Sequence, residues 1–306
     1  GAHTKFNGDV YISGMDQVSS ADYDINIIEL KSSVEDIAQF RLPYAWQHQS
    51  INVPDYLYTL GDAGFSGSLT GNVKEFIALG VLTTEIGTLH GDVHFYKNQS
   101  DSVYRYQGGL QAKDFDMGLL FDDEMLGQVH MSTSIRGQGF TADDLDIEVT
   151  GNIYAVDFLG HRYQNLELEG SFVQQMFSGA FLVDDPDIFL DFRGTIDFNN
   201  PVPVFDFQTY IDHANLSRLN VFQRDSLQES LLSADVLINA RASSMDDLEG
   251  VIMINNLLYE EYPVEKDRQA QNSFRYETES IVLSNTLWPD SLKHLRIRSD
   301  ILDAEA

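Results

Sequence analysis

The sequence lacks cysteine altogether and is poor in basic residues and in long apolar runs. Without cysteine there is no disulfide framework, no thiolate metal site and no thiol nucleophile. The 306 residues include 19 Lys and Arg but 48 Asp and Glu, which gives a formal charge of −29. Binding to nucleic acid needs cations that neutralise phosphates, and an anionic membrane surface would repel this chain. We therefore expect no nucleic-acid partner.

Membrane-spanning and targeting segments are missing from the printed sequence. No apolar stretch approaches the roughly 18 residues of a membrane span, and 76–82 (FIALGVL) is among the longest. There is no signal peptide and no membrane anchor. We interpret the chain as an internal fragment of a longer protein.

Motifs of common enzyme classes are missing as well. There is no P-loop, no dinucleotide fingerprint and no H-E-x-x-H, and GFSGS (64–68) does not have the spacing of a nucleophile elbow. We expect no catalytic residue and no cofactor. Carboxylates paired only in space leave a glycan-active hydrolase open as the least supported alternative.

No metal site is predicted either. His90 and His94 fall on the polar side of an expected strand, so we interpret them as surface residues. The acidic stretches 121–125, 142–146 and 183–187 lack EF-hand spacing. Because Asp favours turns, we interpret all three as connections between strands rather than calcium sites.

What the sequence has in abundance is alternation with period two, which is typical of strands with one apolar and one polar face. It recurs from Phe65 onward, with short polar connections such as 184–187 and 198–201. The fold class predicted is all-β: a long antiparallel meander that curls into a trough with an apolar groove, and a few short helices. The residues predicted to line the groove are Phe65, Leu69, Leu89, Val93, Phe95, Leu110, Leu145, Ile147, Val149, Ile153, Leu166, Leu168, Phe172, Phe181, Ile188, Leu190, Phe192, Ile196, Phe198, Phe205 and Phe207.

Glycine occurs at the apolar parity of six of these segments, where a core-facing side chain would be expected. The six positions are Gly67, Gly91, Gly108, Gly151, Gly170 and Gly194. One interpretation is that each marks a bulge or a bend in a sandwich. The other is that glycine on a concave side lets a sheet of well over a dozen strands curl, and leaves space inside the fold for a ligand.

Helix signals are few. Short helices are predicted in 33–40 and 54–61, and one or two more in 215–233, where leucines follow a roughly helical spacing. The polar stretch 260–278 is predicted to be a long hairpin loop or an edge region. The domain prediction is a single elongated β domain, 1–306, with sub-blocks 1–60, 61–215 and 216–306.

The glycine-punctuated strand pairs of 65–95 and of LDIEVTGNIYAVDFLGHRYQNLELEGSFVQQMFSGAFLVDDP resemble the AsmA-like translocation and assembly module family, TamB. So do the passages 205–222 and 237–259. The resemblance covers roughly 60–302 and, more faintly, 6–14. It rests on a repeating pattern and contains no catalytic motif.

The resemblance implies a non-enzymatic function in the periplasm of a Gram-negative cell. Such proteins are inner-membrane-anchored and cross the periplasm as an elongated U-shaped sheet, a β-taco, whose apolar groove holds phospholipid. The resemblance therefore implies a U-shaped, β-taco-like sheet with bound phospholipid or fatty acid, and an outer-membrane Omp85-type barrel as partner through a C-terminal part that this sequence does not include. The expected function is therefore a periplasmic segment in lipid transport or outer-membrane assembly. The alternative is a β-sandwich or β-helix scaffold module that binds a protein or glycan at an envelope surface.

Overall fold

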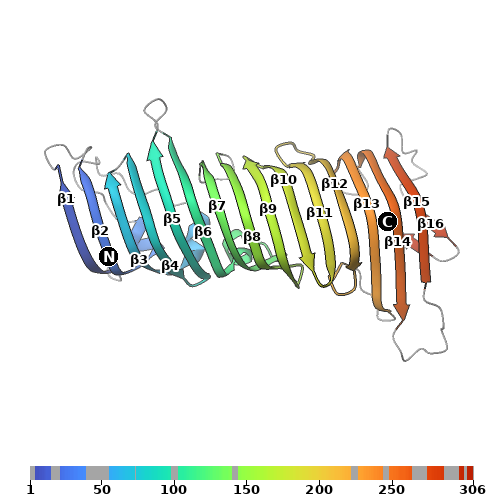
Figure 1. Cartoon of the computed structure of the whole chain (residues 1–306), viewed down its shortest axis with the longest axis horizontal. Helices are drawn as coiled ribbons and strands as arrows, with labels where there is room; N and C mark the ends of the chain where they lie inside the picture. Colours follow the sequence, from blue (N-terminus) through green and yellow to red (C-terminus); the bar gives the residue numbers. More distant parts are fainter. Residues whose placement is uncertain are drawn as a thin grey trace. The chain divides into compact units, whose positions relative to one another are not determined.

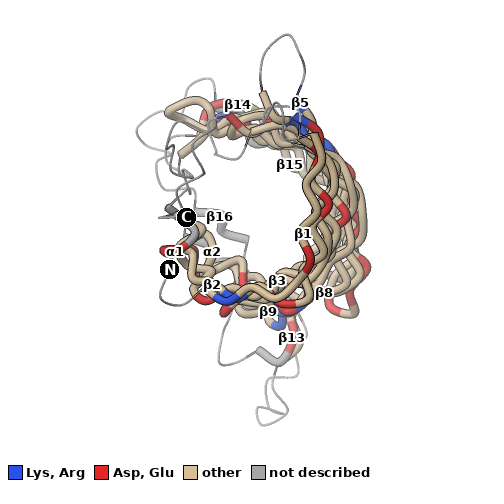
Figure 2. Tube along the Cα trace, turned by 90° about the vertical axis from the view of Figure 1, so that its left-hand side faces the viewer, with Lys and Arg blue, Asp and Glu red and all other residues tan. Residues whose placement is uncertain are grey.

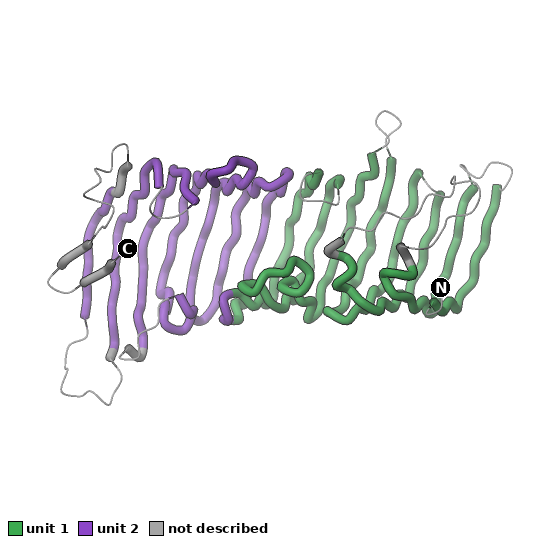
Figure 3. Tube along the Cα trace, turned by 180° about the vertical axis from the view of Figure 1, so that it is seen from behind, with its two compact units in different colours: residues 1–158, 162–164 green, residues 159–161, 165–306 purple. Residues whose placement is uncertain are grey.

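The structure is a computed structural model of the 306-residue chain. It describes residues 4–14, 21–38, 55–72, 74–97, 103–139, 144–221, 227–243, 248–263, 274–285, 296–299 and 302–305. The described chain divides into two compact units, which Figure 3 colours separately. Unit 1 comprises 1–158 and 162–164, and unit 2 comprises 159–161 and 165–306. The division therefore falls at the start of one strand, and neither 60 nor 215 separates the two units.

Strands dominate both units, and their order in the sheet is their order in the sequence (Figure 1). The strands of unit 1 are β1 (Lys5–Ser13), β2 (Asp22–Ser33), β3 (Asp62–Asn72), β4 (Glu75–Thr84), β5 (Gly87–Lys97), β6 (Tyr104–Asp116), β7 (Leu126–Gln138) and β8 (Asp146–Phe158). Each pairs antiparallel with the next. This is the predicted antiparallel meander.

Unit 2 continues the same pattern. Its strands are β9 (His161–Val173), of which 162–164 belong to unit 1, then β10 (Met176–Asp185), β11 (Ile188–Asp197), β12 (Val204–Asn215), β13 (Leu227–Arg241), β14 (Glu249–Pro263) and β15 (Phe274–Asn285). A separate hairpin joins β16 (Arg296–Ser299) to β17 (Leu302–Glu305). A sandwich would need two facing sheets and a β-helix would need parallel strands, so both alternative architectures are excluded for β1 to β15.

Among the described residues, the helices are short and lie in unit 1. They are α1 (Val34–Ala38), the 3-10 helix η3 (Asp55–Leu60) and α2 (Met117–Phe121). The first two fall in the predicted segments 33–40 and 54–61. In the described part of the chain, no helix is long and apolar enough to cross a membrane.

Local capping explains where α1 and α2 begin. The Ser33 hydroxyl accepts a hydrogen bond from the Asp36 backbone N–H at 3.1 Å. The Asp116 carboxylate accepts one from the Leu119 N–H at 2.9 Å. Ser and Asp favour this position because they satisfy a backbone donor that has no partner inside the helix.

In the described parts of 215–233, which are 215–221 and 227–233, the helix prediction is wrong, and residues 222–226 lie outside the described residues. Residues 215–221 form a hydrogen-bonded turn, in which the Leu219 N–H donates to the Asn215 carbonyl at 2.9 Å. From Leu227 onward the chain is strand β13, paired on one side with β12 and on the other with β14. Two strand partners outweigh a weak helical leucine spacing, because propensity is only a weak prior.

The polar stretch 260–278, predicted as a long hairpin loop or an edge region, contains the end of β14 and the start of β15, the last strand in the order of the 15-stranded sheet. β14 continues to Pro263 and β15 begins at Phe274, and the two pair along most of their length. Residues 264–273, between them, lie outside the described residues.

The strands of unit 1 are bent along their length, around the side on which α1 and α2 lie (Figure 2). That side carries the only large buried cluster of unit 1 among the described residues. The cluster joins Val34 of α1 and Leu60 of η3 to strand residues Ala112, Phe115 and Val129, with Ile86. The helices therefore fill one end of the curved face with a packed core.

Candidate functional site

The candidate site of each unit is its apolar face, which we define as the strand face formed by the cross-strand rows given below. Side chains on one face of a strand recur every second residue, and directly paired residues share a face. The strand register therefore tests whether the apolar positions predicted in different strands lie on one common face.

In unit 1 the register places the predicted residues on one common face. Three rows can be followed from β3 to β8: Phe65–Leu82–Leu89–Ala112–Met131–Ile153, Gly67–Gly80–Gly91–Leu110–Thr133–Gly151, and Leu69–Ala78–Val93–Gly108–Ile135–Val149. A fourth row brings Phe95 and Ile147 to the same face.

Unit 2 shows the same arrangement from β9 to β13. Its rows are Leu166–Val183–Leu190–Ile211–Ala234, Leu168–Phe181–Phe192–Thr209–Val236, Gly170–Gly179–Gly194–Phe207–Ile238 and Phe172–Phe177–Ile196–Phe205–Ala240. Aromatic rings contact one another both within a row and between neighbouring rows. The Phe192 ring lies 4.5 Å from the Phe181 ring and 4.9 Å from the Phe207 ring, measured between centroids.

The two faces of a strand differ sharply in exposure. On β8, Ile147, Val149 and Ile153 are half-buried, whereas Glu148 and Thr150 between them are exposed. A few residues of the apolar face are fully buried, among them Val93 and Phe192. The remainder keep some contact with solvent, because among the described strands β1 to β15 form a single layer.

Some predicted lining residues have other surroundings. Leu89 and Ile153 pack against the cluster under the helices, so they belong to a filled part of the face. Phe198 follows the end of β11 and remains 53% exposed. Leu145 precedes β8 and is half-buried.

Glycines form a row on each apolar face. Gly67, Gly80 and Gly91 pair in succession in unit 1, and Gly170, Gly179 and Gly194 do so in unit 2. The space above them is only partly empty. A Cβ on Gly170 would lie 2.6 Å from the Phe177 ring, and one on Gly80 would lie 2.7 Å from the Phe65 ring. These rings cover the glycines, as large aromatic side chains do in many sheets.

The sequence analysis missed Gly80 and its neighbours on β4. The run 76–82 (FIALGVL) is apolar at odd and at even positions, so alternation does not show whether the odd or the even residues lie on the apolar face. The register does: Ala78 and Gly80 share the apolar face, whereas Ile77 and Leu79 are about half exposed on the other, at 47% and 52%.

The opposite face is polar and carries a hollow of about 650 Å³ in unit 1. Gly109 belongs to its lining, and a Cβ there would meet no atom within 4 Å. Charged groups of both signs line it, including Asp92, Arg136 and Glu148. His94, predicted to be a surface residue, lines the hollow, and its Nε2 atom lies 3.0 Å from Oε1 of Glu75.

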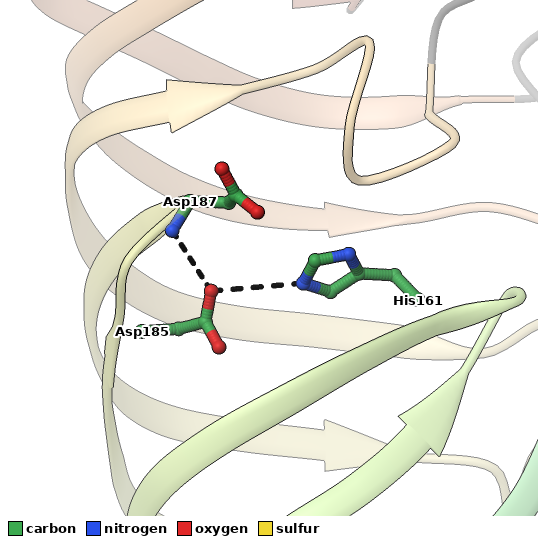
Figure 4. A group of neighbouring side chains, drawn as sticks. All are labelled: His161, Asp185 and Asp187. Carbon is green, nitrogen blue, oxygen red and sulfur yellow. Dashed lines mark hydrogen bonds and ion pairs between the residues drawn. The ribbon is translucent and has the colours of Figure 1, made fainter.

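One group of side chains in the described part of the chain has the composition of a metal site: His161, Asp185 and Asp187 (Figure 4). We call it the rim cluster. The predicted turn 183–187 is a strand end followed by a turn, and it supplies both carboxylates. The sequence analysis missed the cluster because His161 comes from the preceding hairpin, more than twenty residues away.

Comparison of the chain with protein-family models, curated proteins and solved structures returns no match. Function must therefore be argued from the geometry and from the sequence pattern.

Proposed function

We propose that the apolar faces of the two units bind lipid acyl chains, and that the chain is a non-enzymatic segment of a lipid-transport or assembly protein of the bacterial envelope, similar to TamB. The observation that carries this proposal is the single layer of strands. Rows of Leu, Ile, Val and Phe lie on one face of each unit, and most of them are half-buried with no second sheet above them among the described residues.

Hydrocarbon suits such a face better than a polar ligand. Each CH₂ group removed from water contributes about 0.8 kcal/mol, so an acyl chain of about 14 such groups would gain about 11 kcal/mol before the cost of ordering it. Neighbouring rows offer similar surfaces, so a chain could move from row to row with little change in free energy. This binding needs no precisely placed polar group.

Photocrosslinking tests the proposal with neighbouring residues on opposite faces. A crosslinking amino acid at Leu168 or Leu190 should capture phospholipid in cells, because both positions lie in rows of the apolar face. The matched controls are Glu167 and Asp191, one residue away on the polar face. Equal capture from both faces, or none from either, would contradict the proposal.

Introducing a charge separates an open face from a filled core. Leu190→Glu should abolish lipid capture while the chain stays folded by circular dichroism, because a half-buried position leaves the new carboxylate access to water. Asp191→Glu is the control on the polar face. If Leu190→Glu unfolds the protein, the face is a packed core and the proposal fails.

A second candidate function is favoured by the hollow on the polar face of unit 1. Its charged and amide side chains suit a polyhydroxy ligand such as a glycan, through hydrogen bonds. Gly109→Phe would fill the hollow without a steric clash of its Cβ. If glycan binding is the function, this variant loses binding on a glycan array. Lipid capture at Leu168 is expected to be unaffected.

A further inference from the structure

We propose that the rim cluster, His161, Asp185 and Asp187, binds a divalent transition metal, for which zinc is the probe. One ligand atom from each side chain lies within 4.8 Å of the others. One imidazole nitrogen and two carboxylates match the ligand preferences of Zn²⁺, whereas Ca²⁺ and Mg²⁺ prefer oxygen ligands alone. The inference does not depend on lipid binding.

A backbone carbonyl orients the imidazole ring of His161. The Nδ1 atom of His161 lies 3.1 Å from the backbone carbonyl oxygen of Arg218. A carbonyl oxygen only accepts hydrogen bonds, so Nδ1 carries a proton, and in a neutral ring Nε2 carries the lone pair. Metal-binding histidines are commonly held in this way, by a carbonyl on the nitrogen that does not bind the metal.

The second ring nitrogen of His161, Nε2, faces a buried carboxylate. It lies 3.6 Å from Oδ1 of Asp185, whose side chain is only 1% exposed, and the His161 side chain is itself only 12% exposed. A lone pair and a carboxylate oxygen repel each other unless a cation or a proton lies between them. The Asp187 backbone N–H donates to the same Oδ1 at 2.8 Å and fixes the carboxylate in place (Figure 4).

Negative charges outnumber positive charges among the described side chains around His161. Arg218 contacts Asp187 at 3.2 Å and Glu229 at 3.1 Å, so one positive charge is shared between two carboxylates. With Asp185 included, the side chains of this group in the described part of the chain carry three negative charges and one positive charge when the His161 ring is neutral. A divalent cation would compensate the remaining charge of −2. The Arg218 side chain is 58% exposed and has room to withdraw from Asp187.

The surrounding structure holds the three ligands in place. The turn 215–221 supplies the Arg218 carbonyl, and its Leu219 side chain is only 2% exposed. The Asn215 N–H donates to the Asp187 carbonyl at 2.8 Å, and the Asn220 side chain donates to the Leu159 carbonyl at 3.2 Å. All of these residues belong to unit 2, so the site is formed within one unit.

Calorimetric titration of the metal-free full chain with Zn²⁺ tests the proposal. The wild-type protein should bind one zinc ion, and zinc should raise its thermal midpoint, because a ligand that binds only the folded state stabilises it. His161→Gln should weaken binding tenfold or more. Asp187→Asn keeps the size of the side chain and an oxygen for Arg218, and it should weaken binding similarly.

The control is His94→Gln. His94 lies beside the Glu75 carboxylate on a polar face, and among the described residues it belongs to no group of three side chains whose ligand atoms lie as close together as those of the rim cluster. Its loss should leave zinc affinity and stoichiometry unchanged. In an NMR spectrum, zinc should shift the Nε2 resonance of His161 and leave that of His94 in place.

Two results would overturn the proposal. One is a wild-type protein that binds no zinc, in which case a proton on Nε2 and an ion pair with Asp185 account for the cluster. The other is zinc binding that His161→Gln and Asp187→Asn do not weaken while both remain folded, which would place the ion on the acidic surface.

Discussion

Gly67 and Gly91 show how differently two glycines of one row can be constrained. Both pair with Gly80 on β4. A Cβ on Gly67 would lie 2.1 Å from the Leu79 carbonyl oxygen, whereas one on Gly91 would meet only a Val93 methyl group at 3.7 Å. The backbone of β4 therefore approaches Gly67 too closely for any side chain, and Gly91 is free of that constraint.

We expect Gly67→Ala to lower the free energy of unfolding by about 1–3 kcal/mol, because the strand must shift to admit the methyl group. Gly91→Ala should change it by less than about 1 kcal/mol, and a gain is possible because alanine restricts the unfolded chain. Urea unfolding of both variants measures the difference. Equal losses of unfolding free energy at both positions would show that the sheet requires glycine throughout the row. The close approach of β4 to Gly67 would then not be the cause.

Glu29 lies between two lysines at the edge of unit 1. Lys5 and Lys31 are direct cross-strand partners, a pairing of like charges that is unfavourable alone. Glu29 contacts Lys5 at 2.7 Å and Lys31 at 2.8 Å. Hydrogen bonds from Lys31 and then Lys5 lower the pKa of Glu29 to about 2, from its ordinary 4.5.

A carboxyl group whose pKa is lowered by folding stabilises the folded state at any pH above the pKa of the unfolded state. This stabilisation is lost as the pH falls toward the pKa of the folded state. For Glu29 the loss therefore falls between about pH 4.5 and pH 2. NMR titration of the carboxyl carbon should give the lowered pKa, and Lys31→Met should raise it toward 4.5. Lys113→Met, on β6, is the control and should leave it unchanged. A Glu29 pKa near 4.5 in the wild type would show that the lysines remain in solvent.

At the scale of elements, the apolar faces combine filled regions with more open ones. In unit 1 the helices cover one end of the face, where Phe115 is only 4% exposed within a packed cluster. In unit 2 Leu168 keeps partial contact with solvent, although Phe192 in the same row is buried. Side chains in the two regions should therefore differ in their contribution to stability.

Truncation measures that difference. Phe115→Ala should cost about 3–5 kcal/mol, as for other buried aromatic side chains. Leu168→Ala should cost about 1 kcal/mol, because its side chain leaves a half-exposed position and creates no closed cavity. Chemical denaturation gives both values. A cost at Leu168 as large as at Phe115 would mean that material outside the described residues fills the face there.

At the scale of the whole molecule, the charge of −29 is the dominant feature. Like charges repel one another in the compact state, and salt screens that repulsion. We expect added sodium chloride to raise the thermal midpoint by about 2–4 °C, which for a chain of this size corresponds to roughly 1 kcal/mol. Sucrose, which is uncharged, separates screening from a general solvent effect. A midpoint that falls with salt would show that favourable ion pairs outweigh the repulsion.

The sequence by itself determined the fold class and which residues share a face. Period-two alternation follows directly from the geometry of a strand, so it predicted an antiparallel meander and placed Leu168 and Phe192 at the apolar positions of their own strands, which the register brings to one face. Where the pattern was ambiguous the sequence was insufficient. In 76–82 both parities are apolar, and in 215–233 a leucine spacing imitated a helix.

The tertiary structure alone decided which glycines are crowded, where helices fill the curved face, and that His161 meets Asp185 and Asp187. These features depend on the register between strands and on contacts between distant turns. The reason is physical: alternation is a local property of the backbone, whereas the distance between two side chains on different strands depends on every hydrogen bond that fixes their register.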